Sequence, residues 1–231
     1  MIEIYKRSGA THEAVVLKSV LFPQIGGKYQ NVSEEYVKAA IEKSKNGNNE
    51  SVSTPITDAE SLRIYLKNFP DNDAAAPYAV SVNVSDLSGI ASALIYNKNK
   101  YVNLDLSGST LTGIRNSAFS DCTSLTGITM PANVTSIGNS AFYSCTNLVS
   151  ITIPSSVTSI GTGAFFSCDS LTSVTFEGTI LSNNFDNTTG SWSAFFGDLR
   201  DKFYATNAIN GTPGTYTTTA PVSESSVWVK Q

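Results

Sequence analysis

Charged side chains are scarce in this sequence, and the basic ones form no dense cluster. Charged residues make up 15% of the 231 residues, against about 25% in typical globular proteins, and the net charge is −4. Serine, threonine, asparagine and glycine take their place. A nucleic-acid-binding protein needs a basic patch that neutralises phosphates, so the composition argues against a nucleic-acid partner.

Long apolar runs are also missing. No window approaches the roughly 18 consecutive apolar residues that indicate a membrane-spanning helix. The first residues, MIEIYKRSGATHEAVV, do not combine a basic segment with a following apolar one, as a signal peptide does. We therefore expect no membrane span. The residues leave three routes open: a cytoplasmic protein, export by another route, or a signal that was already removed.

Histidine and cysteine are too few for most catalytic or metal-binding arrangements. The one histidine, His12, cannot by itself supply the triads or paired-histidine zinc sites of common hydrolases. Three cysteines, Cys122, Cys145 and Cys168, are spaced 23 residues apart, and an odd number argues against a disulfide framework. Paired Cys-x-x-Cys spacing is absent as well. We expect three buried thiols, with no metal, no cofactor and no enzymatic activity.

What the sequence does contain is an internal repeat. Residues 125–147 (LTGITMPANVTSIGNSAFYSCTN) and 148–170 (LVSITIPSSVTSIGTGAFFSCDS) agree at 13 of 23 positions. A single unit of this length cannot bury its own apolar side chains and must stack on its neighbours. The period therefore predicts a solenoid of stacked coils.

The repeat spacing also separates inward from outward positions. In each unit we expect a strand in which the residues at the L-x-x-I-x-φ positions point into the solenoid, because side chains alternate along a strand. Pro131 and Pro154 are expected to end the strands, and Gly138 and Gly161 to turn the chain. The expected core comprises these apolar residues and their 23-residue equivalents: Leu125, Ile128, Met130, Val134, Ile137, Phe142 and Cys145.

Between the inward residues lie small, polar outward positions. Stacked parallel strands place equivalent residues about 4.8 Å apart, so the outward threonines should form a ladder. If the protein binds a partner on this sheet, the candidate residues are Asn103, Asp105, Thr129, Ser150, Thr152, Ser173 and Thr175. The alternative is that these residues are strand-forming side chains on a solvated face without a binding role.

The N-terminal part divides into two regions. Residues 1–56 show two apolar runs, at 2–5 and 14–22, and a helical pattern that starts after Ser33. Residues 57–100 read as an N-terminal cap of the solenoid. There we expect a helix that begins with a Thr57-x-x-Glu60 capping box, a strand at 78–84, and a helix capped by Ser85 that carries Leu87, Ile90, Leu94 and Ile95.

The last repeat is irregular. Phe165 and Phe195 are 30 residues apart, seven more than the period, and Asp198 occupies the position of the repeat cysteine. The extra residues form a predicted loop with Phe185 and Trp192, which either caps the stack or carries binding residues. Residues 199–231 are expected to form a C-terminal cap with a strand pair around Pro221, and Trp228 should cover the open end of the core.

The repeat unit L-x-x-I-x-[LIM]-P-x-x-V-T-S-I-G-x-x-A-F-x-x-C resembles the Treponema-type, or BspA-like, leucine-rich repeat. Looser copies at 101–124 and 171–198 extend the resemblance, and the segment from Phe203 to Lys230 is similar to the C-terminal cap of small spirochaete members. About 150 residues are covered. The implied fold is α+β but mostly β, a short right-handed leucine-rich-repeat solenoid with an N-terminal α/β cap and a C-terminal β cap around repeats at 101–198.

The resemblance also implies a function. Such proteins are surface-associated or secreted bacterial modules that contact host matrix proteins, host cells or other bacteria, and the family brings no catalytic residues. We therefore expect a non-enzymatic protein-binding module at the bacterial cell surface or outside the cell. The alternative is a cytoplasmic or self-associating structural scaffold, in which residues 1–56 pair with a second chain to form a homo-oligomer.

Overall fold

The computed structural model describes residues 56–188 and 192–231. The chain divides into two units, residues 1–54 with 64–69 and residues 55–63 with 70–231. Apart from residues 64–67 of one helix, the features discussed below lie in the second unit. The predicted strands at 2–5 and 14–22, and the helical pattern after Ser33, lie outside the described residues.

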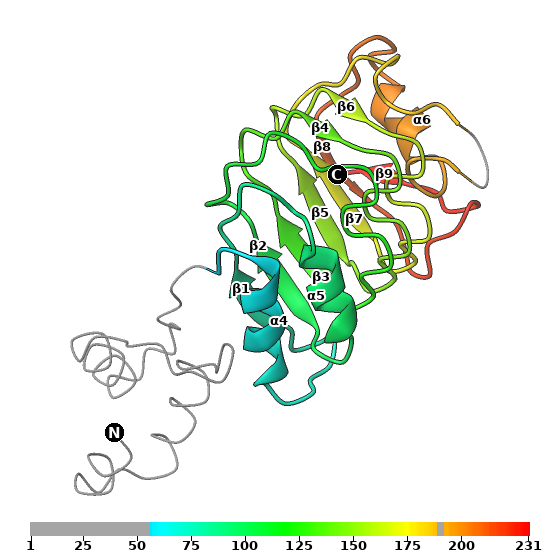
Figure 1. Cartoon of the computed structure of the whole chain (residues 1–231). Helices are drawn as coiled ribbons and strands as arrows, with labels where there is room; N and C mark the ends of the chain where they lie inside the picture. Colours follow the sequence, from blue (N-terminus) through cyan, green and yellow to red (C-terminus); the bar gives the residue numbers. More distant parts are fainter. Residues whose placement is uncertain (1–55, 189–191) are drawn as a thin grey trace, which may run out of the picture. The chain divides into compact units, whose positions relative to one another are not determined.

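A seven-stranded sheet runs through the second unit, and Figure 1 shows β2, β3, β5 and β7 side by side in chain order. Its strands, in spatial order, are β1 (Tyr78–Ser81), β2 (Val102–Asp105), β3 (Leu125–Thr129), β5 (Ser150–Ile153), β7 (Ser173–Phe176), β8 (Gly214–Thr217) and β9 (Val229–Lys230). The first five strands are parallel, whereas β8 and β9 are antiparallel to their neighbours. A second sheet pairs β4 (Ser136–Ile137) with β6 (Ser159–Ile160).

The strand register follows the sequence period. Gly127 of β3 pairs with Ser150 of β5, and Ser150 pairs with Ser173 of β7, which is a shift of 23 residues at each step. One repeat is therefore one coil of the stack. The predicted mostly-β leucine-rich-repeat solenoid is confirmed.

The predicted core residues are buried in every coil, and together they form columns along the stack. The phenylalanines show this most clearly: the rings of Phe119 and Phe142 are 5.3 Å apart at 10°, and those of Phe142 and Phe165 are 5.0 Å apart at 6°. Phe195 continues the column, 4.5 Å from Phe165. The seven extra residues between Phe165 and Phe195 therefore leave the aromatic column in phase.

Hydrogen bonds also join the coils on the sides away from the large sheet. The amides of Phe119 and Phe142 donate to the carbonyls of Ala141 and Ala164, both at 2.7 Å. Asparagine side chains add a second ladder. The Oδ1 atom of Asn116 accepts from the Asn139 amide at 2.8 Å, and that of Asn139 accepts from the Thr162 amide at 3.0 Å. The repeated residues thus satisfy backbone groups of the next coil.

Gly138 and Gly161 begin turns, as predicted, since the amides of Ala141 and Ala164 donate to their carbonyls, both at 3.3 Å. Neither glycine has a positive φ, however; each lies against the backbone of the preceding coil, where a Cβ atom on Gly161 would be 2.7 Å from the Asn139 amide nitrogen. Positive φ occurs two residues later, at Ser140 (53°) and Gly163 (62°). Glycine is therefore required at these two positions for close packing of the coils and not for a positive φ.

The start of helix α4 (Ala59–Lys67) also differs from the prediction. The N-terminal cap is Asp58 and not Thr57. Its Oδ1 atom accepts from the Ser61 amide at 2.8 Å, and its Oδ2 atom accepts from the Ser61 hydroxyl at 2.7 Å. These hydrogen bonds, led by the one from the Ser61 amide, stabilise the charged carboxylate and hold the pKa of Asp58 below its usual value.

Helix α5 (Ile90–Tyr96) is shorter than predicted. It begins after Gly89, whose φ of 80° breaks the helical backbone, so Ser85 does not cap it. Leu87 precedes the helix, yet it is buried together with Ile90 and Leu94. Ile95, predicted for the apolar face, is largely exposed.

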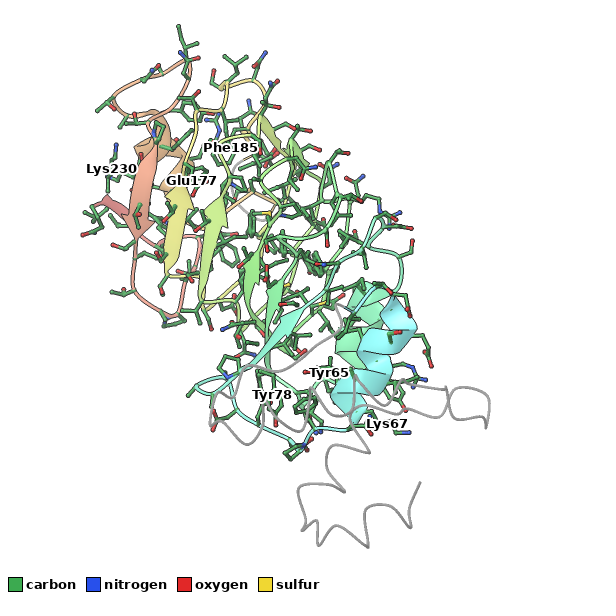
Figure 2. All side chains as sticks on the ribbon, turned by 90° about the vertical axis from the view of Figure 1, so that its left-hand side faces the viewer. Tyr65, Lys67, Tyr78, Glu177, Phe185 and Lys230 are labelled. Carbon is green, nitrogen blue, oxygen red and sulfur yellow. The ribbon has the colours of Figure 1, made fainter. Side chains whose placement is uncertain are left out.

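The C-terminal region closes the stack with a helix as well as the predicted strand pair. Helix α6 (Leu199–Tyr204) follows Asp198, whose Oδ1 atom accepts from the Trp228 amide at 2.7 Å. Trp228 is buried, as predicted, and its Nε1–H donates to the Phe196 carbonyl at 2.9 Å. Figure 2 shows Tyr78 at one end of the large sheet and Glu177 and Lys230 toward the other.

Candidate functional site

The outward side of the large sheet carries two parallel rows of small side chains, which we call the sheet face. One row is Ala79, Asn103, Gly127, Ser150, Ser173 and Thr217, and the other is Ser81, Asp105, Thr129, Thr152, Thr175 and Thr215. All seven candidate residues from the sequence lie in these rows. Asp105 is the one charged residue among the twelve.

Exposure differs along the sheet face. The side chains of Asn103, Thr129, Ser150 and Thr152 are exposed, whereas those of Asp105, Ser173 and Thr175 are half-buried. The antiparallel strand β8 lies directly beside β7, and the hydroxyls of Thr175 and Thr215 are hydrogen-bonded at 2.9 Å. The middle strands therefore present the most accessible part of the face.

A bulge interrupts the predicted regularity between β2 and β3. Val102 pairs with Leu125, but Asn103 pairs with Gly127, so Thr126 is the extra residue. The Thr126 hydroxyl donates to the carbonyl of Val102 at 2.9 Å and lies at the same distance from Asn103 Oδ1. A Cβ atom on Gly127 would be 2.6 Å from that oxygen, so glycine at this position leaves room for the Asn103 amide.

Asp105 is held in its charged form by neighbouring hydroxyl and amide groups. Burial alone would favour the neutral carboxyl. Hydrogen bonds from the Ser107 amide, at 2.9 Å, and from the Ser107 and Ser81 side chains outweigh that effect and leave the pKa of Asp105 below its usual value. The sheet face therefore carries a single fixed negative charge toward its N-terminal end.

A second surface feature was missed by the sequence analysis. The exposed ring of Trp192 lies 6.2 Å from that of Tyr143 and 5.7 Å from that of Phe166, and the Tyr143 and Phe166 rings are 5.9 Å apart. Phe196 joins the group, 4.7 Å from Phe166. We call these four side chains the aromatic ledge. The signal was available, because Tyr143 and Phe166 occupy one repeat position, directly after the buried Ala-Phe pair.

The predicted insertion loop is divided between the core and this ledge. Phe185 is buried and pairs with Ile160 in a parallel bridge, so it extends the second sheet of the solenoid. Trp192, in contrast, is 55% exposed. The expected loop thus contributes one residue to the closure of the stack and one to its surface.

The three cysteines are buried free thiols, as predicted. Cys145 Sγ donates to the Phe119 carbonyl at 3.0 Å, and Cys168 Sγ donates to the Phe142 carbonyl at 3.1 Å. Burial raises the pKa of Cys122 to about 12, and it also raises the pKa values of Cys145 and Cys168. Protonated, inaccessible thiols are poor nucleophiles and metal ligands.

Two other kinds of site are absent from residues 56–188 and 192–231. In these ranges no group of three or more histidine, cysteine or acidic side chains is arranged to hold a metal ion. No helix in the same part of the chain is both long and apolar enough to span a membrane. The polar sheet face and the aromatic ledge both carry exposed side chains that another molecule can contact.

The repeat architecture has counterparts among known proteins. Residues 88–196 match the BspA type leucine rich repeat region in six copies. No curated protein matches the chain. Proteins with this repeat are generally surface or protein-interaction modules and are typically non-enzymatic. The 23-residue coils, their buried phenylalanine and cysteine columns and this match together show that residues 88–196 consist of BspA-type leucine-rich repeats.

Proposed function

We propose that this protein is a non-enzymatic protein-binding module and that the sheet face is its contact surface. The proposed contact residues are Asn103, Asp105, Thr129, Ser150, Thr152, Ser173 and Thr175. The partner is a protein at or outside the cell, such as a host or matrix protein, and the role is adhesion or partner capture by a bacterial surface or secreted protein.

The observation that carries this proposal is the continuity of the sheet face. Five parallel strands and one antiparallel strand present two rows of short side chains, which continue across the bulge at Thr126, with one charge among twelve residues. Short side chains lose little conformational entropy when a partner docks on them, and their hydroxyls can donate and accept hydrogen bonds. Affinity on such a face comes from shape and hydrogen bonding more than from charge.

The exposed middle of the face is the expected centre of contact. Thr129, Ser150 and Thr152 have exposed side chains on the middle strands β3 and β5, while Thr175 already shares a hydrogen bond with Thr215. Energetically important contacts concentrate near the centre of an interface. We therefore expect substitutions at Thr152 to weaken partner binding more than substitutions at Thr175.

Thr152→Arg tests the proposal directly. A long charged side chain in the middle of the sheet face should block docking, whereas the stability of the fold should change by less than about 0.5 kcal/mol, as for ordinary surface substitutions. The measurement is binding to a panel of immobilised matrix proteins by surface plasmon resonance, with urea unfolding in parallel.

Thr158→Arg is the matched control. Thr158 is exposed on the same coil, beside the second sheet, so the substitution adds the same charge and bulk away from the sheet face. Binding that is lost in Thr152→Arg and kept in Thr158→Arg supports the sheet face. Equal affinities for the two variants and the wild type would remove this face as the contact surface.

Surface exposure is tested on intact cells. Protease added to cells that express the native protein should degrade it if it is displayed outside. Full protection of the protein, with degradation after cell lysis, would contradict the proposed location and favour the intracellular scaffold.

A further inference from the structure

The aromatic ledge lies on a different side of the coils from the sheet face. The sheet-face residues belong to the strands at 102–105, 125–129, 150–153 and 173–176, whereas Tyr143 and Phe166 follow the second sheet, in the segment that carries the buried phenylalanines. The two surfaces can therefore be altered independently by substitution.

Trp192 is exposed but held in place. Its ring lies within 20° of parallel to both the Tyr143 and Phe166 rings. A Cβ atom built on Gly163 would be 3.7 Å from Trp192 Cε3, so the indole also lies against the backbone of this coil. A large apolar ring that is already ordered loses little conformational entropy when a ligand packs on it.

The coil segment that carries two of the ledge rings is polar and uncharged. No charged residue occurs between Ser136 and Cys168, the stretch that contains Tyr143 and Phe166. Within it the exposed Asn139 accepts from the Thr162 amide. An acidic side chain contacts this segment, because Thr162 donates to Asp186 Oδ1 at 3.0 Å. An anionic ligand would therefore find no complementary charge in this segment.

We propose that the aromatic ledge binds neutral saccharides. The C–H face of a sugar ring is an apolar patch of slightly positive hydrogens, which is attracted to the negative face of an aromatic ring. The hydroxyls around the sugar ring need donors and acceptors. The Ser140 hydroxyl can supply both, since Ser140 Oγ and Trp192 Cε3 lie 3.6 and 3.7 Å from one point, the position of a Cβ atom built on Gly163. Trp192 and Tyr143 are the expected stacking residues.

A neutral saccharide fits this surface better than an apolar peptide does. Between Ser136 and Cys168 the only large apolar side chain in the exposed class is Val149, so the ledge lacks the broad apolar surround that excludes water from a protein–protein hot spot. The Ser140 hydroxyl lies close to the Trp192 indole instead.

The test uses the full chain and three soluble neutral polysaccharides: dextran, mannan and a β-glucan. Retardation in native gels that contain each polysaccharide measures binding. Tryptophan fluorescence reports on the site, because the chain has two tryptophans and Trp228 is buried. We expect at least one polysaccharide to retard the protein and to change its fluorescence.

Trp192→Ala should weaken this binding about tenfold, and Tyr143→Ala should weaken it as well. Ile209→Ala, which removes another exposed apolar side chain from the C-terminal region, should bind as the wild type does. Thr152→Arg should also bind normally, which separates this proposal from that for the sheet face. Urea unfolding of each variant checks that the fold is retained.

Three results would overturn the proposal. The first is the absence of retardation of the wild type by all three polysaccharides. The second is equal retardation of the wild type, Trp192→Ala and Tyr143→Ala. The third is that the wild type binds no saccharide while Trp192→Ala and Tyr143→Ala lose binding to a protein partner. That result would make the ledge a protein-binding surface.

Discussion

In the stacked coils the buried phenylalanines lie face to face, whereas in the C-terminal region the buried aromatic rings meet at steep angles. Phe119, Phe142 and Phe165 are within 10° of parallel to their neighbours. Phe203 meets Phe185 at 60° and Tyr204 at 83°, and Phe176 meets Tyr216 at 81°. Both arrangements are favourable for aromatic rings.

The difference shows how a repeat specifies packing. Each coil is displaced from the previous one by nearly a pure translation, so equivalent rings must keep one orientation and stack. The C-terminal region has no following coil, and its rings come from strands and a helix that run in different directions. There the chain fills the open end with tilted and edge-to-face contacts among Phe176, Phe185, Phe203, Tyr204 and Tyr216.

The largest effect is expected when a ring is removed from the middle of the stack. Phe142→Ala should lower the free energy of unfolding by about 3–5 kcal/mol, because the side chain is fully buried between Phe119 and Phe165. Coils depend on their neighbours, so hydrogen exchange should increase on both sides of the substitution, with loss of cooperative melting.

Phe203→Ala provides the comparison in the C-terminal region. Its loss of stability should be of similar size, but faster hydrogen exchange should be confined to the segments that pack around Phe203 at the end of the stack. The same exchange pattern for both variants would contradict the nearest-neighbour interpretation. An unchanged melting temperature for Phe142→Ala would contradict its place in the core.

A smaller effect is expected where coils approach each other closely. Gly161→Ala should cost about 1–3 kcal/mol, because the added methyl group meets the backbone and side chain of Asn139 in the preceding coil. Gly163→Ala is the matched control. It has a positive φ, but the added methyl group would make only ordinary van der Waals contacts, at 3.6–3.8 Å. Ser140 adopts a similar φ at the equivalent position, so a cost of about 1 kcal/mol is expected. Urea unfolding measures both, and a larger loss in Gly163→Ala would contradict this account.

The smallest effect is a change of stability with pH, which differs between the coils and the C-terminal region. Burial raises the pKa of Cys122 to about 12 and that of Tyr204 to about 12, from different starting values. An unfolded thiol loses its proton near pH 8.5 and an unfolded tyrosine near pH 10. The stability that each protonated group contributes is therefore complete below its unfolded pKa and declines as pH rises above it.

Between pH 8 and 9.5 the thiols of the coils should dominate the decline. In Cys122→Ala the decline should be smaller than in the wild type by about 1 kcal/mol. Urea unfolding at both pH values measures the difference. Rapid reaction of all three native thiols with a labelling reagent, or an identical pH dependence in the variant, would contradict their burial.

Much of the solenoid could be predicted from the residues. The spacing of Leu125, Ile128 and Met130 indicated which residues of the strand point inward. The threonines that alternate with such residues indicated the outward side. The predicted positions of the coil strands and the predicted burial of Trp228 are confirmed. These predictions succeed because the same arrangement of apolar and polar residues recurs in each repeat. A recurring arrangement does not arise easily by chance.

The candidate sites were less accessible to this reasoning. All seven outward residues lie in the sheet-face rows, but their binding role stays a prediction. The aromatic ledge could not be predicted without the position of Trp192. This residue lies in the irregular insertion, so the 23-residue period does not relate it to Tyr143. Spacing arguments do not extend across such an insertion.

By itself, the sequence determined the period, the solenoid, its inside and its outside, because alternation along a strand and a 23-residue repeat are local properties of the chain. The tertiary structure decided which glycines are needed for close packing and which has a positive φ. It also decided where β8 pairs antiparallel with β7 and which aromatic rings gather on the surface. Each of these depends on groups from different coils or from the closing segment, and their distances are set only when the coils stack.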